Sequence, residues 1–413
     1  MLAGSVQPVC QSAAQAIEST YGSGSSFNKS YTALDGTNSS LSGQMFLTSL
    51  AAGDFEFEHI IEGAHPASAM FPTLLCVADA HHKTGEDLLA AMAIGYGFAT
   101  RIGAATTLTA ETVKGFHIVG SNGDLATAAA VGNLLNYDAD TIASAMGIAA
   151  SSSGGLQAYI STGAMTRRLY PARAGQLGAE AAFQADAGIE GPRDVLENLE
   201  GYLHAFSHNP KPELMTTGLG KEWMSAQQTV KLAPVHAWAQ DAEAVKNVTI
   251  YGNRPHVFDP NTWIANPSSF QAAQYSVPFG IAAALTTDLR NPLRMNDVLL
   301  KDTAALAIAA EMKQVPISDD PDFLWGYLTL ELHQKAVNIL FDGFPRLPTS
   351  APVLLQAVEN KLANIVDAFG VQADAVKDMI LDVRSLCDVS VLFDEMVRVG
   401  KLATAKFEAK AAQ

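Results

Sequence analysis

The sequence predicts a mainly α-helical protein, with a large all-helical domain and a smaller α+β domain inserted into it. The chain has 413 residues, too many for one simple core, and 48% of them are hydrophobic against 16% charged. Its first half is rich in alanine and glycine and carries repeated helix-start signals, whereas strand-like stretches appear only after about residue 245. We place the helical domain at 1–243 and 351–413 and the α+β domain at 244–350.

Start and stop signals predict the helices of the first half. Residues 84–87, Thr-Gly-Glu-Asp, form a capping-box-like start for an apolar helical pattern. The Asn-Gly pair at 122–123 predicts a turn before an alanine-rich helix at 124–135. Two further helices are expected at 140–150 and from Pro171 to a stop before Gly188. So many small residues predict helices that pack closely, as in a bundle.

The inserted domain is predicted from a change in residue pattern. The stretches 248–251 and 327–332 are β-branched or alternating and are expected to be strands. Helical stretches near 270–286 and 296–313 lie between them, which predicts an α+β arrangement. Residues 351–369 return to a helical pattern and are assigned to the first domain.

Charge and cysteine content exclude several classes of function. Forty-two acidic against 26 basic residues give a net charge of −16, which argues against nucleic acid and anionic membrane surfaces as partners. Cys10, Cys76 and Cys387 lie far apart and offer no ligand spacing for zinc or an iron–sulfur cluster. Their sparse, odd number is typical of a reducing compartment. We therefore expect no bound metal.

Neither a membrane span nor a secretion signal is expected. The longest apolar run, 88–100, contains Tyr96 and ends at Arg101, short of the roughly 18 residues that a spanning helix needs. The first basic residue is Lys29, so the basic start of a signal peptide is missing. These features predict a cytoplasmic protein, or one of an organelle interior.

Basic residues gather at the predicted starts of four helices. They are His65 before Pro66, Lys114 and His117 before the helix near 124, Arg167, Arg168 and Arg173 around Pro171, and Lys231 and His236 around Pro234. Helix starts carry unpaired N–H groups and about half a positive charge, so bases there oppose the helix dipole unless an anion lies between them. The pattern therefore indicates a pocket for a small polycarboxylate. The alternative is that each base pairs with one of the many acids on the surface.

Other titratable residues give weaker signals. His204 and His208 could share a helix face as zinc ligands do, but no third ligand has suitable spacing. The acidic stretch 56–62 predicts either a solvated face or a pocket wall. The sequence has no GxSxG elbow, no phosphate loop and no GxGxxG fingerprint, which disfavours hydrolase, kinase and nicotinamide-dependent functions.

Several of these stretches, in their order and spacing, resemble the MmgE/PrpD family. They are residues 63–68 (Gly-Ala-His-Pro-Ala-Ser), 115–117 (Gly-Phe-His), 168–171 (Arg-Leu-Tyr-Pro), 231–236 (Lys-Leu-Ala-Pro-Val-His) and 273–279 (Ala-Gln-Tyr-Ser-Val-Pro-Phe). The family includes 2-methylcitrate dehydratase, cis-aconitate decarboxylase and iminodisuccinate epimerase. The resemblance implies a large helical domain, an α+β domain that acts as a lid, a homodimer, and catalysis without a cofactor.

The resemblance also implies which residues line the pocket. Asp54, His65 and His117 match the family's aspartate and two histidines, and Lys231 and His236 keep the expected spacing of five residues.

Three departures from the family pattern leave the anion pocket in place but change the groups that could take part in the reaction. The family's first catalytic lysine falls on Arg167, which binds carboxylates but is no proton donor of tunable pKa. An Asp-Asp-Thr run becomes Glu56-Phe57-Glu58, and a later histidine becomes Gln240.

Together these features predict a cofactor-free lyase, a dehydratase or decarboxylase, that acts on a small di- or tricarboxylate such as 2-methylcitrate or cis-aconitate. The reaction is a proton transfer at a carbon next to a carboxylate. The expected roles are a base at His117 or Lys231, proton donation or substrate orientation by His65 and His236, and carboxylate binding by Arg167, Arg168, Arg173 and Lys114. The alternatives are an epimerase of a polycarboxylate such as iminodisuccinate, and a non-catalytic polycarboxylate-binding protein.

Overall fold

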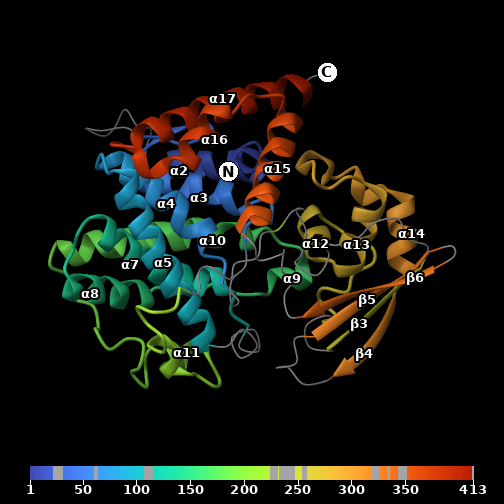
Figure 1. The fold of residues 1–413 in the computed structure, drawn as a ribbon, viewed down its shortest axis with the longest axis horizontal. Coiled ribbons are helices and arrows are strands. Elements are labelled where there is room, and N and C mark those ends of the chain that lie inside the picture. The colour runs from blue at the N-terminus through green and yellow to red at the C-terminus, as the bar shows by residue number, and fades with distance from the viewer. Residues whose placement is uncertain are drawn as a thin grey trace.

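Two groups of elements lie side by side in the computed structural model (Figure 1). Helices α1 to α11 form one group, helices α12 to α14 and a sheet form the other, and α15 runs between them. The structure describes residues 1–21, 31–59, 64–106, 115–223, 231, 247–253, 258–318, 325–332, 335–342 and 351–411. The predicted fold class, mainly α-helical, is confirmed.

The first group is built from helices, most of which share one hydrophobic core. They are α1 (Leu2–Ser5), α2 (Pro8–Tyr21), α3 (Leu41–Gly53), α4 (Pro66–Ala80), α5 (Gly85–Thr106), α7 (Ile118–Leu134), α8 (Ala139–Ala150), α9 (Tyr159–Thr162), α10 (Thr166–Asp186) and α11 (Tyr202–Phe206), with the C-terminal α16 (Asp374–Leu381) and α17 (Ser390–Ala411). Helix α15 (Ala351–Phe369) is the one that runs between the groups. Two short antiparallel strands, β1 (Tyr31–Thr32) and β2 (Asn38–Ser39), precede α3, and 3-10 turns lie at Pro212–Met215 and Val383–Ser385.

Small residues let these helices pack closely, as predicted. Helix α10 crosses the group and contacts α3, α4, α7 and α8. A Cβ at Gly178 of α10 would lie 2.3 Å from the carbonyl oxygen of Asp124 in α7, so only glycine fits at this crossing. This contact fixes α10 against α7, the two helices whose N-terminal ends carry Arg167 and His117.

Several predicted helix boundaries are confirmed. Thr84 and Asp87 form the reciprocal cap of α5, because Thr84 N–H donates to the Asp87 carboxylate and Asp87 N–H donates to the Thr84 hydroxyl, both at 3.1 Å. Helix α8 spans the predicted 140–150, and α10 ends before Gly188, whose φ of +92° is the left-handed stop that glycine allows.

Two boundary predictions are wrong. The Asn-Gly pair at 122–123 makes no turn, because α7 begins at Ile118 and runs through it; a Cβ at Gly123 would lie 3.0 Å from Ala174, so this glycine serves close packing. Helix α10 begins at Thr166 rather than at Pro171, which lies inside its second turn. Pro171 has no backbone N–H to donate to the carbonyl of Arg167, so α10 lacks one intrahelical hydrogen bond there.

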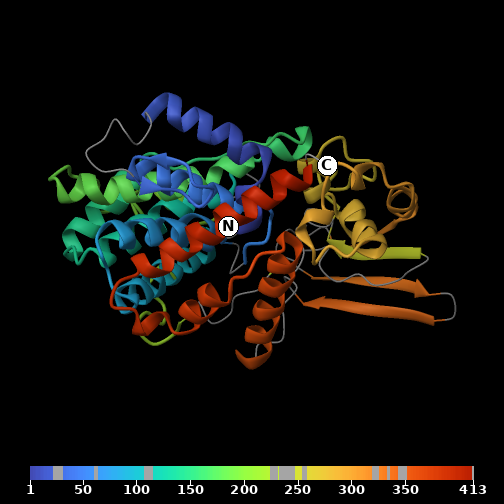
Figure 2. The same ribbon diagram turned by 90° about the horizontal axis from the view of Figure 1, so that it is seen from above.

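The second group combines a four-stranded sheet with helices on one face (Figure 2). The strands are β3 (Asn247–Asn253), β4 (Lys313–Ser318), β5 (Trp325–Leu332) and β6 (Lys335–Asp342), in the order β4-β3-β5-β6. Strands β3 and β4 are parallel, and the other pairs are antiparallel. The crossover between β3 and β4 carries α12 (Phe270–Tyr275), α13 (Val277–Thr286), α14 (Thr303–Glu311) and two 3-10 turns, Pro292–Arg294 and Leu299–Lys301.

The sequence predicted two of these strands and missed two. Strands β3 and β5 contain the predicted stretches 248–251 and 327–332. Strand β4 contains Pro316, which disfavours a strand by pattern but is tolerated here because β4 lies at the edge of the sheet. A separate hydrophobic cluster between residues 248 and 312 packs β3 against α12–α14. The domain limits at 244 and 350 stay a prediction.

Helix α5 extends further than the apolar run suggested. It continues through Arg101 to Thr106 and is long and apolar enough to cross a membrane by length and composition alone. Half of its apolar window is buried inside the protein, where it packs against α4 and α7. A core helix of a soluble protein passes the same test, so this is weak evidence for a span.

Candidate active site

Three buried carboxylates follow the end of α3. Asp54 is the C-terminal cap of this helix, and Glu56 and Glu58 lie in the turn and loop after it. Their side chains are almost fully buried, with exposed fractions of 1%, 4% and 6% for the three residues. Glu56 has a φ of +56°, a left-handed conformation that costs a non-glycine residue about 1–2 kcal/mol. This part of the acidic stretch is therefore an interior wall and not a solvated face; Glu62 lies outside the described residues.

The first turn of α10 brings Arg167 to these acids. Arg167 Nη1 donates to the carbonyl oxygen of Gly53 at 2.9 Å, and its Nε lies 2.7 Å from Glu56 Oε1. Its Nη2 forms an ion pair with Glu58 Oε1. The guanidinium is thus held by α3 and by two carboxylates of the stretch that follows it.

Arg168 joins the two groups of elements. Its Nη1 pairs with Asp54, while its Nε and Nη2 donate to the side-chain oxygens of Gln271 and Gln274, at 2.7 and 3.0 Å. Both glutamines belong to α12, and the guanidinium lies over the ring of Phe270, 4.9 Å from its centroid. Arg168 therefore fixes the second group against α3 and α10.

Lys231 completes a cluster of three acids and three bases. Its Nζ lies 3.0 Å from Glu56 Oε2, and the Tyr275 hydroxyl donates to Glu56 Oε1 at 2.9 Å. Lys231 is 3% exposed. Buried ion pairs of this kind contribute little net stability, because desolvation offsets their attraction, so the cluster points to function.

His65 caps the start of α4 and offers a free lone pair. Its Nδ1 lies 3.1 Å from the carbonyl oxygen of His59, which can only accept, so the proton of the neutral ring is on Nδ1. Nε2 is then an acceptor. Burial lowers the pKa of His65 to about 3, with Lys231 and Arg167 adding to the effect and Glu58 opposing it.

His117 caps the start of α7 and, unlike His65, offers a hydrogen-bond donor at Nε2. Its Nδ1 accepts the backbone N–H of Val119 at 3.3 Å, so the neutral ring carries its proton on Nε2 and is a donor there. Burial, and then the charges of Arg167 and His65, hold the pKa of His117 well below its usual value. A neutral histidine at a helix start can polarise a developing anion without giving up its proton.

Two further groups in the cluster have pKa values near neutrality. Burial raises the pKa of Asp54 to about 6, although the charge of Arg168 opposes the rise. Lys361 of α15 donates from Nζ to the carbonyl oxygen of Phe57 at 2.6 Å and lies over the Phe57 ring. Burial lowers the pKa of Lys361 to about 7.

The structure brings together six of the nine residues singled out by sequence as catalytic or substrate-binding. They are Asp54, His65, His117, Arg167, Arg168 and Lys231. Arg173 is not among them: it is exposed and donates to Gln176 of its own helix, because α10 starts five residues earlier than predicted. Lys114 and His236 lie outside the described residues, as does Gln240.

Several residues that complete the cluster had no predicted role. Gln274 and Tyr275 stood in one of the quoted motifs, but nothing in that motif indicated that they bind Arg168 and Glu56. Gln271 and Lys361 carried no signal. The prediction that each base pairs with an acid is right for the cluster, but the acids are buried neighbours rather than surface groups. Among the described residues no group of three or more His, Cys, Asp or Glu side chains could hold a metal.

Comparison with known proteins places this geometry in a family. Residues 1–215, more than half of the chain, match the MmgE/PrpD N-terminal domain. The chain belongs to the MmgE/PrpD family. The matched part contains α3, α4, α7 and the start of α10, and hence Asp54, His65, His117, Arg167 and Arg168.

Curated relatives carry related names. The chain is 32% identical over 197 residues to the cis-aconitate decarboxylase-like protein oryM of Aspergillus oryzae, 31% over 209 residues to the cis-aconitate decarboxylase of Homo sapiens, and 29% over 209 residues to that of Mus musculus. These matches cover 44%, 48% and 48% of this chain, and 41%, 43% and 42% of the relatives. The matched region thus spans less than half the length of each relative.

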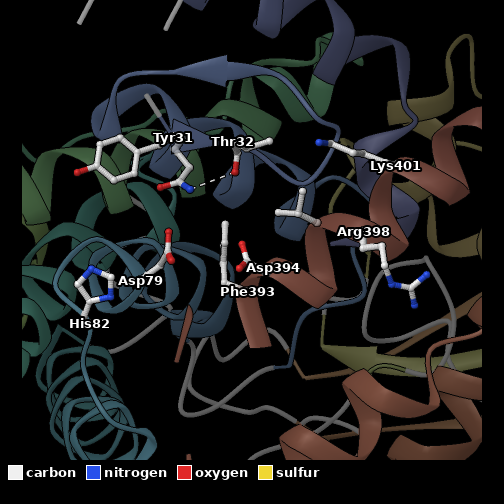
Figure 3. Close-up of a pocket in the computed structure, with 10 residues that line it drawn as sticks. Tyr31, Thr32, Asp79, His82, Phe393, Asp394, Arg398 and Lys401 are labelled. Atoms are coloured by element: carbon white, nitrogen blue, oxygen red, sulfur yellow. Dashed lines mark hydrogen bonds between the residues drawn. The ribbon is translucent and has the colours of Figure 1, made fainter. Parts of the chain in front are cut away.

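A separate cavity lies elsewhere in the helical group (Figure 3). It has a volume of about 510 Å³ and is lined by β1, α3, the end of α4 and α17. Charged groups of both signs face it, among them Asp79, Asp394 and Lys401, while Arg398 is paired with Glu395. This mixture gives the cavity no preference for an anionic ligand, in contrast to the helix starts around His65, His117 and Arg167.

Proposed function

We propose that the protein is a cofactor-free lyase, a decarboxylase or dehydratase, that transfers a proton at a carbon next to a carboxylate of a small polycarboxylate. The observation that carries the proposal is the meeting of three helix starts in one buried cluster. The N-terminal ends of α4, α7 and α10 supply a histidine acceptor, a histidine donor and two arginines. The names of the relatives, cis-aconitate decarboxylase, support the same class of reaction.

The two histidines have complementary roles in this proposal. His65 offers the Nε2 lone pair and would accept the substrate proton, while His117 Nε2–H would donate a hydrogen bond to the charge that develops on the carboxylate. This reverses the roles expected from the sequence, where His117 was a candidate base and His65 a proton donor. A bound carboxylate near His65 would raise its low pKa, because a negative charge favours the imidazolium.

The bases of the cluster supply the remaining steps. Arg167 and Arg168 would attract the substrate carboxylates by their charge, since their N–H groups already bind acceptors of the protein. In a decarboxylation the bond from the substrate carbon to its carboxylate breaks, carbon dioxide leaves, and the electron pair stays on that carbon. The Lys231 ammonium, 3.0 Å from Glu56, would then supply the proton that forms the new C–H bond. In a dehydration His65 removes the proton and hydroxide leaves from the neighbouring carbon.

Incubation with a panel of small polycarboxylates in deuterated water tests the proposal. A lyase converts at least one acid to a product that has lost carbon dioxide or water, which mass spectrometry and NMR detect, and a decarboxylation leaves deuterium on the new C–H bond. Conserved mass with deuterium in an isomeric product would instead identify the alternative, an epimerase. If no acid in the panel is converted or labelled, the chain is a binding protein and the proposal fails.

Three further predictions from the sequence and its family resemblance belong to the same proposal. We propose that the active protein is a homodimer, that it needs no metal, and that it works in the cytoplasm. Light scattering after size-exclusion chromatography measures the first. Full activity in EDTA, together with elemental analysis of the purified protein, tests the second, and fractionation of the source cells tests the third.

A further inference from the structure

Tyr159, the first residue of α9, lies among the aromatic rings around His117. Its ring centroid is 5.7 Å from that of His117, and the rings of Tyr170 and Tyr275 lie 6.1 and 5.2 Å away, all in edge-to-face orientation. Tyr159 is almost fully buried, with 2% of the residue exposed. It therefore belongs to the candidate site, although no motif in the sequence indicated it.

The backbone just before Tyr159 is fixed to the segment that precedes His117. The N–H of Gln157 donates to the carbonyl oxygen of Gly115, and the side-chain amide of Gln157 donates to the carbonyl oxygen of Phe116, both at 2.9 Å. Gly115 and Phe116 lead directly into His117, the N-terminal cap of α7. These bonds hold Tyr159 in place beside the His117 ring.

The hydroxyl of Tyr159 is buried without a hydrogen-bond partner. None of the described residues meets it at hydrogen-bond geometry. The Tyr275 hydroxyl is close enough to affect the pKa of Tyr159, but it donates its own proton to Glu56 at 2.9 Å. Burying a hydroxyl without a partner costs free energy, and polar groups in protein interiors are nearly always paired. The partner of this hydroxyl is therefore expected from outside the protein, in a bound ligand.

The surroundings of Tyr159 indicate what that ligand offers. Burial raises the pKa of Tyr159, and the charge of Arg167 opposes the rise, so the hydroxyl keeps its proton and is available as a donor. The neighbouring His117 presents a second neutral donor at Nε2, and the 5.7 Å between the two rings is short enough for both donors to reach one group. Two converging donors next to an arginine favour an anionic acceptor, and a carboxylate has two oxygens to accept them.

We propose that Tyr159 is a further substrate-binding residue, whose hydroxyl donates a hydrogen bond to the same substrate carboxylate that His117 Nε2–H contacts. The inference rests on the proposed function, since it concerns the ligand of that same site. It separates Tyr159 from its neighbour Tyr170, whose hydroxyl is already occupied: it donates to the carbonyl oxygen of Leu156 at 2.6 Å and accepts the N–H of that residue at 3.0 Å.

Equilibrium binding to Tyr159→Phe, which removes only the hydroxyl, tests the inference. The probes are glutarate and tricarballylate, two unreactive acids that carry two and three carboxylates on a propane skeleton, and calorimetry gives their dissociation constants. For whichever acid binds the wild-type protein more tightly, we expect the constant to rise by about 10–10²-fold in Tyr159→Phe, because a hydrogen bond to a charged group is lost.

The stability of the ligand-free variant gives a second readout. The hydroxyl makes no hydrogen bond in the folded protein, so the midpoint of denaturant unfolding should stay the same or rise in Tyr159→Phe. A tyrosine whose hydroxyl supports the fold behaves in the opposite way. Tyr170→Phe provides that comparison, because it loses both bonds to Leu156 and its unfolding midpoint should fall.

Tyr137→Phe is the control for binding. It removes a hydroxyl outside the cluster, one that forms a hydrogen bond with Asp186, and should leave the dissociation constants of both acids unchanged.

The outcomes separate the inference from the proposed function. Wild-type affinity for both acids in Tyr159→Phe, or an unfolding midpoint lowered as in Tyr170→Phe, overturns the role of Tyr159 and leaves lyase activity standing. Weaker binding in Tyr159→Phe, with no conversion of any acid in the panel, supports the inference while the proposed lyase fails. If the folded wild-type protein binds neither acid, the anion site is absent and both fall together.

Discussion

His65 and His117 both lie at helix starts. The sequence indicated these positions through Pro66 after His65 and through the Gly-Phe-His triplet that ends at His117. It could not assign their roles, because the role depends on which backbone atom faces Nδ1. A carbonyl faces it in His65 and an N–H faces it in His117. The acids show the same limit of prediction. Asp54 was predicted from the sequence, but the roles of Glu56 and Glu58 depend on partners in α10 and α12, more than 100 residues away.

Glutamine substitutions separate the two histidine roles. In His117→Gln the amide nitrogen can replace the Nε2–H donor, so we expect kcat to fall only about tenfold. His65→Gln removes the basic ring nitrogen that takes up the proton, because an amide is not a base near neutral pH, and should lower proton exchange by about 10²-fold or more. The readout is the rate of deuterium incorporation together with kcat for a substrate found in the panel. A larger loss in His117→Gln than in His65→Gln would contradict the tautomers assigned from the backbone contacts.

Arg168 and Arg173 were predicted as equal ligands for carboxylates, and the structure makes them unequal. Arg168→Ala should weaken substrate binding by about 1.5–3 kcal/mol, seen as an increase in KM, because it removes the buried positive charge that we propose attracts a substrate carboxylate and leaves Asp54 without its partner. Arg173→Ala removes an exposed side chain that contacts Gln176, and we expect KM and stability to change by less than about 0.5 kcal/mol. An equal increase in KM in the two variants would show that Arg173 also contacts the substrate.

At the scale of elements, local signals predicted a helix start correctly where a cap acts within one turn, and failed at two starts where packing against other helices decides. The cap at Thr84 and Asp87 acts within one turn and was read correctly. The Asn-Gly pair at 122–123 and Pro171 are breakers by local preference, but burial against neighbouring helices overrides that preference. The extra turn of α10 determines which arginines belong to the site. It puts Arg167 and Arg168 at the buried helix start and leaves Arg173 exposed.

Two glycine substitutions test the crossing of α10 and α7. An added methyl at Gly178 would lie 2.3 Å from the Asp124 carbonyl and 2.6 Å from Thr127 Cβ, so Gly178→Ala should destabilise the fold by about 1–3 kcal/mol despite its better helix propensity. Gly97 of α5 has nothing within 4 Å of its added methyl, and Gly97→Ala should stabilise by about 0.4–1 kcal/mol.

Denaturant unfolding of both variants provides the measurement. If α10 and α7 must separate to admit the methyl, Gly178→Ala should also lose activity, because His117 and Arg167 lie at the starts of these helices. A Gly178→Ala protein as stable as Gly97→Ala would show that the crossing is looser than described.

At the scale of the whole molecule, the cluster lies where both groups of elements and the C-terminal α15 meet. Helices α3 and α10 supply the ion pairs, α12 supplies the glutamines that bind Arg168, and α15 supplies Lys361. Length and composition predicted a mainly helical fold with an inserted α+β part, since these depend on chain-wide patterns. They could not predict which segments meet, because that depends on contacts between residues far apart in the sequence.

Burying so many titratable groups in one place makes stability depend on pH. Burial lowers the pKa of His59 to about 4 and that of His65 to about 3, and holds that of His117 well below its usual value. Below pH about 6.5 the unfolded chain takes up these three protons and the folded protein does not, so stability is lost as the pH falls. Asp54 and Asp124 act in the opposite direction, because burial raises their pKa values to about 6 and about 8.

The three histidines outnumber the two aspartates, so the free energy of unfolding should fall by about 1.4 kcal/mol per pH unit between pH 6 and 4.5. Denaturant titrations across this range measure the slope. His65→Gln removes one of the histidine protons and should make the curve nearly flat, whereas His208→Gln, at an exposed histidine, should leave the slope unchanged. A slope that is the same in wild type and His65→Gln would mean that His65 is charged in the folded protein, and it could not then serve as the base that the proposed reaction requires.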